Sequence, residues 1–283
     1  MEKERKRSIF YVFLAALLFS IGGLCVKVIP WSPLAINGAR NLVGVLVIGV
    51  YLLASRHRLV FSVPVFVGAA SMVGVTTLYT VANKLTTAAN AIVLQFTAPV
   101  FVILFMMLFF HAKPKKLDLA ACAAVFLGIL FFFVDGLQAG NMAGNLVAVL
   151  SGVCYAGVFM MNASKKADAM SSVFFGQLIS AVLFAPLCFW ETDFSPHTVT
   201  ALLALGVFQL GLAYIFLSLG IRHTPPVTAS LITGIEPVLN PILVAVFYGE
   251  QISATALAGA VIVVGAILLY NILKSRSSGA SVN

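Results

Sequence analysis

One carboxylate lies in the middle of a long apolar stretch, where a charged group is difficult to accommodate. The stretch covers residues 228–250, and Glu236 is followed there by Pro237, Asn240 and Pro241. A charge at bilayer depth costs about 2.5–3.5 kcal/mol on insertion scales, and such residues usually mark a pathway or a paired site. Each proline also removes a helix hydrogen bond that lipid cannot replace. We therefore expect this segment to face protein or a water-filled cavity.

Two roles are open for the carboxyl group of Glu236. Burial disfavours the charged form of a carboxyl, so Glu236 could take up and release a proton, or attract a cationic group of a small molecule. The alternative is structural, because the carboxyl could hydrogen-bond to the helix end that Pro237 or Pro241 leaves free. At helical spacing Thr233 and Asn240 share a face with Glu236, so these three side chains form the first candidate site.

A second stretch, residues 90–107, has a similar pattern of residue types. When Pro99 is placed on Pro237, Gln95 falls on Thr233. An uncharged amide in an apolar helix suits hydrogen bonding to a bound molecule, and equally suits bonds between helices, which contribute about 0.6–2 kcal/mol. The expected helix breaks or hinges are Pro99, Pro237 and Pro241.

Polar side chains in other apolar segments could line the same cavity or bond to neighbouring helices. Buried tyrosine hydroxyls need a partner, which water in a cavity or a backbone carbonyl can supply. The side chains assigned to the cavity on this basis are Ser20, Tyr79, Asn83, Tyr155, Asn162 and Tyr214. Arg40 could extend outward to the interface or neutralise a substrate carboxylate, and the residues alone leave both roles open.

The composition assigns the chain to the membrane proteins. Hydrophobic residues make up 61% and charged residues 9% of its 283 residues, whereas a soluble domain has about 25% charged residues. Apolar segments near the roughly 20 residues needed to span a bilayer recur along the chain, so we predict an all-α integral membrane protein. The ten expected transmembrane helices are 8–29, 33–54, 63–83, 88–110, 117–134, 142–162, 171–189, 197–219, 227–248 and 253–273.

The basic residues predict how the chain is oriented. The net charge is +8, but Lys and Arg lie in short loops between apolar segments, which is typical of cytoplasmic loops and not of a nucleic-acid surface. With the N-terminus inside, fourteen of the 17 Lys and Arg residues face the cytoplasm. We therefore expect both termini in the cytoplasm, in the inner membrane of a prokaryote, with no nucleic-acid partner.

The chain also contains an internal repeat. Residues 86–105 and 224–243 agree in their prolines, their small residues and the spacing between them. Each half holds five expected spans, and because five is odd the second half inserts with opposite topology. We predict two inverted five-helix repeats, residues 1–139 and 140–283, the second with a short C-terminal tail, around a central cavity near the midplane.

Four short motifs resemble those of a known family. They are IEPV at 235–238, GEQIS at 249–253, TAPV at 97–100 and the pair Ala39–Arg40. In a ten-span repeat these resemble the EamA family of the drug/metabolite transporter superfamily, although FHAK at 110–113 replaces a common Gly-Glu pair. The resemblance implies a cavity lined largely by spans 1, 3, 4, 6, 8 and 9, with span two outside it, and so favours the structural role for Arg40. Members move small organic metabolites, amino acids among them.

The repeat and the resemblance together favour a secondary active transporter. We expect an exporter of small metabolites such as amino acids that works by alternating access, either proton-coupled or facilitative. A channel or facilitator without ion coupling is the alternative, and an intramembrane enzyme is a more remote one. No GxxxxGK[ST] loop and no HExxH motif is present, so neither ATP machinery nor enzymatic activity is expected.

No cofactor or metal is expected either. The four cysteines lie in different apolar segments without metal-binding spacing. The expected partners are a small-molecule substrate and the lipid bilayer. Small residues in the fifth and tenth spans let helices approach closely, either within the monomer or in a homodimer through these helices. They are Ala120, Ala124, Gly128, Ala256 and Ala260.

Overall fold

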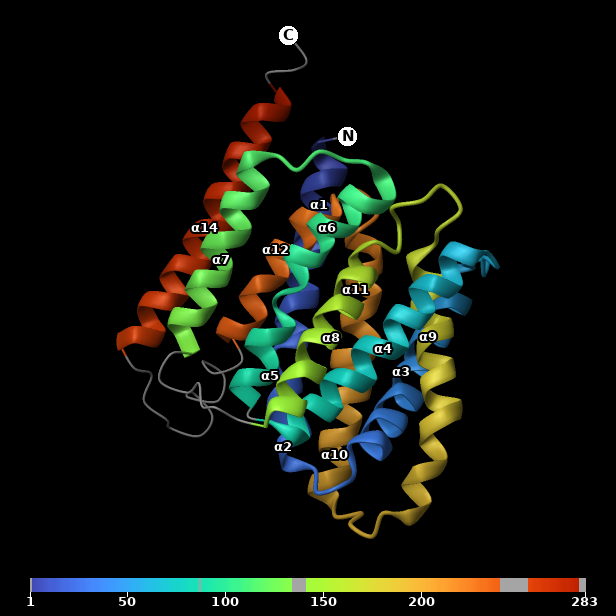
Figure 1. Cartoon of the computed structure of the whole chain (residues 1–283). Helices are drawn as coiled ribbons and strands as arrows, with labels where there is room; N and C mark the ends of the chain where they lie inside the picture. Colours follow the sequence, from blue (N-terminus) through green and yellow to red (C-terminus); the bar gives the residue numbers. More distant parts are fainter. Residues whose placement is uncertain (1, 87, 134–140, 240–253, 280–283) are drawn as a thin grey trace.

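The computed structural model describes residues 2–86, 88–133, 141–239 and 254–279, and in these ranges the secondary structure is entirely helical (Figure 1). Seven helices there are long and apolar enough to cross a membrane. The all-helical membrane architecture is thus observed, while the count of ten spans and the inverted repeat stay predictions. Asn240 and Pro241, two of the predicted site residues, lie outside the described residues.

The first half of the chain forms seven helical segments, most of them crossing the bundle. They are α1 (Glu2–Phe19), α2 (Gly22–Val28), α3 (Pro33–Ser55), α4 (Val63–Leu85), α5 (Ala88–Gln95), α6 (Ala98–Phe110) and α7 (Lys116–Phe133).

The second half contains several short or irregular segments and ends with a long helix. They are α8 (Met142–Phe159), α9 (Ala169–Phe184), the 3₁₀ segment η1 (Ala185–Trp190), α10 (Pro196–Ala204), the π-helical segment η2 (Leu205–Leu212), α11 (Ala213–Gly220), α12 (Pro226–Ile232), the 3₁₀ segment η3 (Thr233–Ile235) and α14 (Ala254–Gly279).

Two of the predicted spans are interrupted. The first is broken at residues 20–21, between α1 and α2, just before the pair Gly22 and Gly23. Glycine pairs are a common cause of kinks because they add backbone freedom and no side-chain packing. The fourth is broken at residues 96–97. Pro99 lies in the first turn of α6, where backbone N–H groups have no partner within the helix, so a proline is tolerated there. The expected break near Pro99 is therefore observed.

Serine side chains begin two of the longest helices. Ser32 and Ser62 precede α3 and α4, and each hydroxyl accepts a hydrogen bond from the backbone N–H three residues later, at Ala35 and Val65. These bonds satisfy N–H groups that a helix leaves unpaired in its first turn. Both helices therefore start at defined points, which fixes the register of the residues further along them.

The helices pack in groups. α4 lies between α8 and α9, and α3 packs against α9 and η2. α7 and α14 run together along one edge of the bundle (Figure 1). A Cβ atom added at Gly128 of α7 would lie 2.8 Å from Val263 Cγ2 of α14, so the predicted small-residue contact is made within the chain. The homodimer through these helices stays a prediction.

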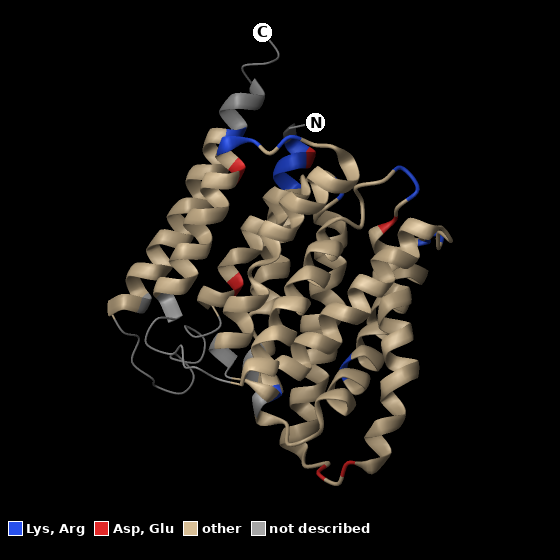
Figure 2. Cartoon of the chain, in the orientation of Figure 1, with Lys and Arg blue, Asp and Glu red and all other residues tan. Residues whose placement is uncertain are grey.

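Charged residues are distributed unevenly between the two ends of the bundle. Figure 2 shows Lys and Arg gathered at the end that carries the N-terminus. We call this the basic end, and it comprises the N-terminus, loops 56–62, 111–115, 160–168 and 221–225, and the C-terminal turns of α14. The loop 191–195 at the opposite end contains Glu191 and Asp193.

Candidate functional site

A small pocket of about 30 Å³ lies inside the bundle. It has room for roughly two water molecules, at about 10–15 Å³ each. Its wall draws on α1, α3, α4, α5, α8, η2, α11 and the helical residues 236–239 that follow η3. The residues of this wall are Phe19, Arg40, Val75, Thr76, Tyr79, Gln95, Tyr155, Gln209, Leu210, Tyr214 and Glu236.

Arg40 provides the positive charge of this pocket and is 1% exposed. Its Nη1 donates to Gln209 Oε1 at 3.1 Å. Its Nη2 donates to Thr80 Oγ1 at 2.6 Å, to the Thr76 carbonyl at 2.7 Å and to Asn37 Oδ1 at 3.3 Å. All four acceptors are neutral, and among the described residues no carboxylate forms an ion pair with Arg40. The guanidinium is held firmly while its charge stays uncompensated.

The position of Arg40 corrects two expectations. The sequence favours a side chain that extends outward to the interface, and the resemblance implies that the second span lies outside the cavity. Instead, the side chain points into the bundle and forms part of the pocket wall. The reason is local, because α4 and η2 supply acceptors at the depth of the guanidinium, which makes burial possible.

The π-helical segment η2 positions one of these acceptors. A π-helix has a wider turn than an α-helix, and short π segments often occur at functional sites. Gln209 lies in η2 and contacts Arg40 through its carbonyl oxygen. On the other side, Gly22 leaves space for the amide, since a Cβ atom there would lie 1.8 Å from Gln209 Nε2. The glycine after the α1 break is therefore needed for the Arg40–Gln209 contact.

Glu236 provides the acidic group of the pocket and is 5% exposed. Tyr155 Oη donates to its Oε2 at 3.5 Å. The backbone N–H of Glu236 donates to the Thr233 carbonyl, which closes the tight turn η3 just before Pro237. The turn therefore places the carboxyl on the pocket wall, where it shares one enclosed space with the Arg40 guanidinium and forms no ion pair with it.

Aromatic rings fill the space around the two charges. The Phe19 ring packs edge-on against Tyr214 at 4.9 Å between centroids, and against Tyr155 at 6.5 Å. Phe159 lies one helical turn after Tyr155, with its ring 4.7 Å away. Edge-on aromatic contacts favour well-defined ring positions. These rings separate the pocket from the basic end of the bundle.

The structure brings five of the predicted site residues together in the wall: Tyr79, Gln95, Tyr155, Tyr214 and Glu236. Others lie elsewhere. Ser20 Oγ donates to the Ala16 carbonyl and Thr233 Oγ1 to the Ser230 carbonyl, so both hydroxyls bond to their own helices. Asn83 is buried outside the pocket wall.

Two further predicted groups of residues also lie away from the wall. Asn162 is in loop 160–168 at the basic end, and Pro99 and Pro237 are buried but do not line the pocket.

The wall also contains residues that the prediction omitted, namely Phe19, Arg40, Val75, Thr76, Gln209 and Leu210. An arginine inside an apolar segment, with Asn37 and Asn41 beside it, was a usable signal for Arg40. Thr76 and Gln209 share helix faces with Tyr79 and Tyr214, but hydroxyl and amide groups recur in most of the spans. The three apolar residues have no signal in the sequence that distinguishes them from core residues.

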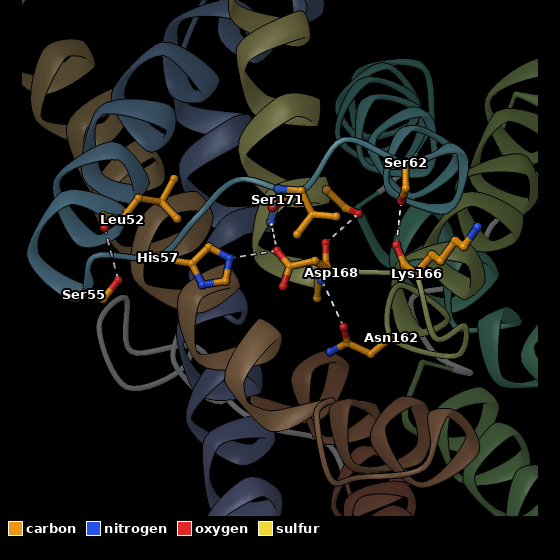
Figure 3. Close-up of polar contacts among 11 residues, drawn as sticks. Leu52, Ser55, His57, Ser62, Asn162, Lys166, Asp168 and Ser171 are labelled. Carbon is orange, nitrogen blue, oxygen red and sulfur yellow. Dashed lines mark hydrogen bonds and ion pairs between the residues drawn. The ribbon is translucent and has the colours of Figure 1, made fainter.

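A second polar cluster joins two loops at the basic end (Figure 3). His57 Nε2 lies 2.9 Å from Asp168 Oδ2, and the same oxygen accepts the Ser171 backbone N–H at 2.8 Å. The Val60 N–H donates to Ser171 Oγ at 3.0 Å. Ser62 Oγ donates to the Lys166 carbonyl at 2.6 Å, as Figure 3 also shows. Loop 56–62 is thereby fastened to loop 160–168, which belongs to the other half of the chain.

Asp168 is the centre of this cluster. Partial burial opposes its charge, but hydrogen bonds from Ser171 and from His57 outweigh this effect and lower the pKa of the Asp168 carboxyl below its ordinary value. The carboxylate also caps the N-terminus of α9, where negative charge is favoured. The cluster is a structural clamp between the two halves and does not touch the central pocket.

Comparisons with known proteins agree with this architecture. The model of the EamA-like transporter family matches residues 6–134 and again residues 142–272. Over 285 residues the chain is 26% identical to a Bacillus subtilis (strain 168) protein named "Uncharacterized transporter YwfM", and 95% of each chain is covered. A Clostridium kluyveri protein named "Uncharacterized transporter" is 26% identical over 210 residues, with 68% of this chain and 66% of that protein covered.

A solved structure described as "Crystal structure of protein" has the same fold. It superposes with a TM-score of 0.80 at 19% identity, over 94% of this chain and 98% of that chain. Because the family model matches both halves and seven described helices are long and apolar enough to cross a membrane, the chain belongs to the EamA-like transporter family of the drug/metabolite transporter superfamily and is a multi-pass membrane transporter.

Proposed function

We propose that this transporter is a secondary active exporter of small zwitterionic metabolites such as amino acids, which it binds between Arg40 and Glu236. One observation carries the proposal: a guanidinium and a carboxyl line the same buried pocket and form no ion pair with each other. An isolated buried charge is unfavourable unless a partner compensates it. A zwitterion offers both partners at once.

Each end of such a solute has a matching group in the wall. The solute carboxylate binds Arg40, whose planar guanidinium suits carboxylate geometry. The ammonium binds Glu236, and Tyr79, Gln95 and Tyr214 supply neutral hydrogen-bonding groups around it. The apolar part of the solute packs against Phe19 and its neighbours. Large polyanions such as nucleotide sugars do not fit this arrangement, because Arg40 is the one cationic side chain among the described residues of the wall.

Binding requires the pocket to expand. Its volume of about 30 Å³ is far below the roughly 300–1,000 Å³ of most small-molecule sites. Several segments of the wall can adjust: α1 ends at a break, α5 ends at a break before Pro99, and Gln209 lies in a π-helical turn. Discontinuous helices beside the site are typical of transporters that work by alternating access.

Glu236 also provides a means of coupling. Without solute, the carboxyl is buried among aromatic rings, where the protonated form is favoured. Arrival of the ammonium displaces that proton, so solute and proton move in opposite directions. Under an inward proton gradient this exchange drives the solute out of the cell. The charge distribution supports an orientation with the basic end toward the cytoplasm. A facilitator that moves the same solutes without a proton is the second candidate.

The proposal is tested by thermal unfolding of the purified protein with each of the common amino acids. A ligand at about 100 times its dissociation constant stabilises the folded protein by about 2.7 kcal/mol. We expect at least one amino acid, for example L-leucine, to raise the Tm, and its two truncated analogues to raise it much less. For leucine these are 4-methylpentanoate, which lacks the amine, and 3-methylbutylamine, which lacks the carboxylate.

Two results would argue against the proposal. If no amino acid raises the Tm and none is exchanged across liposomes, the solutes belong to another class. If one truncated analogue stabilises the protein as well as the complete amino acid, only one of the two charged groups takes part in binding.

A further inference from the structure

A second and larger cavity, of about 290 Å³, lies at the basic end between loop 160–168 and loop 221–225. Small-molecule sites have volumes of about 300–1,000 Å³, so this cavity is at the lower end of that range. The central pocket, with about 30 Å³, has room for water alone. In this conformation a small solute therefore fits at the basic end and not at the centre.

The wall of this second cavity contains hydrogen-bonding groups that have no partner among the described residues. Asn162 Oδ1 accepts the Ala169 N–H at 3.0 Å, which fixes the orientation of the amide, but Asn162 Nδ2 is buried and unpaired. Thr224 is 3% exposed, and its Oγ1 is likewise buried without a partner. Buried polar groups without partners are rare and need an explanation. A ligand with acceptor atoms would satisfy both, after small side-chain rotations.

The charge of the cavity wall indicates which kind of acceptor group the ligand carries. Arg222 and His223 are exposed and belong to the wall, and no Asp or Glu is among the residues that the structure describes there. His223 Nδ1 lies 3.4 Å from Ser8 Oγ, which leaves Nε2 for another contact. Lys165 and Lys166 add exposed positive charge in the same loop as Asn162. An amide NH₂, a hydroxyl and a guanidinium together suit the two oxygens of a carboxylate.

A pair of aromatic rings separates this cavity from the central pocket. Phe159 belongs to the wall of the second cavity, and Tyr155 to the wall of the central pocket. The two rings are in contact at 4.7 Å between centroids, and Phe159 is 1% exposed. Tyr155 also donates to Glu236. Displacement of Phe159 would therefore connect the two cavities and disturb the group that binds Glu236.

We propose that the cavity at the basic end is a second solute site, which binds the carboxylate of a small organic molecule before the solute passes Phe159 to the central pocket. Asn162, Thr224 and Arg222 bind the carboxylate, and Phe159 packs against the apolar part. The order of the two sites rests on the proposed transport function, whereas the affinity of the cavity for a carboxylate is independent of it.

The charge preference of the cavity can be measured without transport. Ala163 lies in the wall, so Ala163→Cys places a thiol there. The full-length variant is treated with an anionic thiosulfonate reagent carrying a sulfonate, or with a cationic one carrying a quaternary ammonium group. Rates are divided by those for free cysteine, and the unmodified chain gives the background from its own cysteines. We expect the anionic reagent to react at least about threefold faster, since a cavity of one charge sign concentrates the opposite sign.

Three substitutions in the Ala163→Cys background test the named groups. Asn162→Asp keeps the acceptor for the Ala169 N–H but puts a carboxylate at the Nδ2 position, and it should reverse the preference. Arg222→Gln should reduce the preference. Arg56→Gln removes an exposed charge that lies at the same end but outside the wall, and it should leave the preference unchanged. Equal rates for the two reagents, or an equal effect of Arg56→Gln and Arg222→Gln, would overturn the proposal.

Protection from labelling identifies the ligand class. We expect sodium 4-methylpentanoate to slow modification of Ala163→Cys and 3-methylbutylamine to leave it unchanged, in nanodiscs of phosphatidylcholine. Protection by added phosphatidylglycerol and not by the carboxylate would assign the cavity to a lipid headgroup and would contradict the proposal. Protection by neither would also contradict it. Because labelling needs no transport, these results remain informative even if no zwitterion binds in the thermal-unfolding experiment.

Discussion

Arg40 and Glu236 line one buried pocket from opposite halves of the chain, and no ion pair joins them. Arg40 is held by four neutral acceptors, whereas Tyr155 donates to Glu236. Charges in an environment of low dielectric constant interact strongly with any third charge that enters. The pocket is therefore prepared for a molecule that carries both signs.

Arg40→Gln should weaken the binding of an amino acid by about tenfold or more, because a hydrogen bond to a charged group contributes about 1.5–3 kcal/mol. The loss should be specific for ligands with a carboxylate and should leave the affinity for 3-methylbutylamine unchanged. Arg40→Lys keeps the charge without the planar fork and should show an intermediate loss. Calorimetric titration measures each affinity. Ser20→Ala, a buried hydroxyl outside the pocket wall, is the matched control.

Glu236→Gln keeps the size of the side chain and an acceptor oxygen, but it cannot release a proton. We expect the variant to bind the solute with reduced affinity and still to exchange it across liposome membranes. Accumulation driven by a pH gradient should be lost, because proton exchange at this carboxyl supplies the coupling. Uptake of labelled solute with and without the gradient measures both activities. A variant that still accumulates solute would leave Glu236 with a capping role only.

Gly22→Ala should reduce amino-acid affinity although Gly22 lies outside the pocket wall. The added Cβ would lie 1.8 Å from Gln209 Nε2 and would displace the amide from Arg40. In a Gln209→Ala background, Gly22→Ala should then change the ligand affinity little, because the effects of two substitutions that act through one contact are not additive. A double-mutant cycle on ligand affinity measures this coupling. Additive losses would show that Gly22 acts by another route.

Asp168 should give the loop clamp a dependence on pH. Its pKa is lowered in the folded protein, so the carboxylate contributes stability above its unfolded-state pKa of about 3.9 and loses it as the pH falls further. Asp168→Asn keeps the α9 cap, so it should have a lower Tm than wild type near neutral pH and converge with it as the pH falls through the lowered folded-state pKa of Asp168. Asp168→Ala also loses the cap, a further loss of about 0.5–2 kcal/mol. Thermal unfolding in detergent across this range measures the effect, and a constant difference between wild type and Asp168→Asn would contradict it.

The orientation can be tested with fusions to a reporter that is active outside the cytoplasm only. A reporter placed after Asn283 should be inactive, because the basic loops favour the cytoplasmic side. The same reporter inserted in loop 191–195, which belongs to the opposite end, should be active. Activity in the first fusion and not in the second would reverse the topology, and with it the direction assigned to the second cavity.

The sequence by itself determined the class of the protein and much of its site. Long apolar segments must be helical in lipid, because no water is present to satisfy an open backbone. A carboxylate such as Glu236 is easily recognised in an apolar segment, because a charge is costly at that depth. The proline at position 99 predicted a helix break, and the structure has one there. Tyr79, Gln95, Tyr155 and Tyr214, which the sequence assigned to the cavity, line the central pocket, and their role in binding stays a prediction.

Only the tertiary structure decided which of the polar residues meet. Ser20, Asn83 and Thr233 satisfy the same sequence criteria as Tyr79, yet they lie outside the pocket wall. Arg40 joins the pocket because α4 and η2 bring acceptors to it from residues far apart in the chain. Helical periodicity defines the faces of one helix, but the rotation of each helix depends on how its side chains pack against all its neighbours. That packing set the positive end of the site.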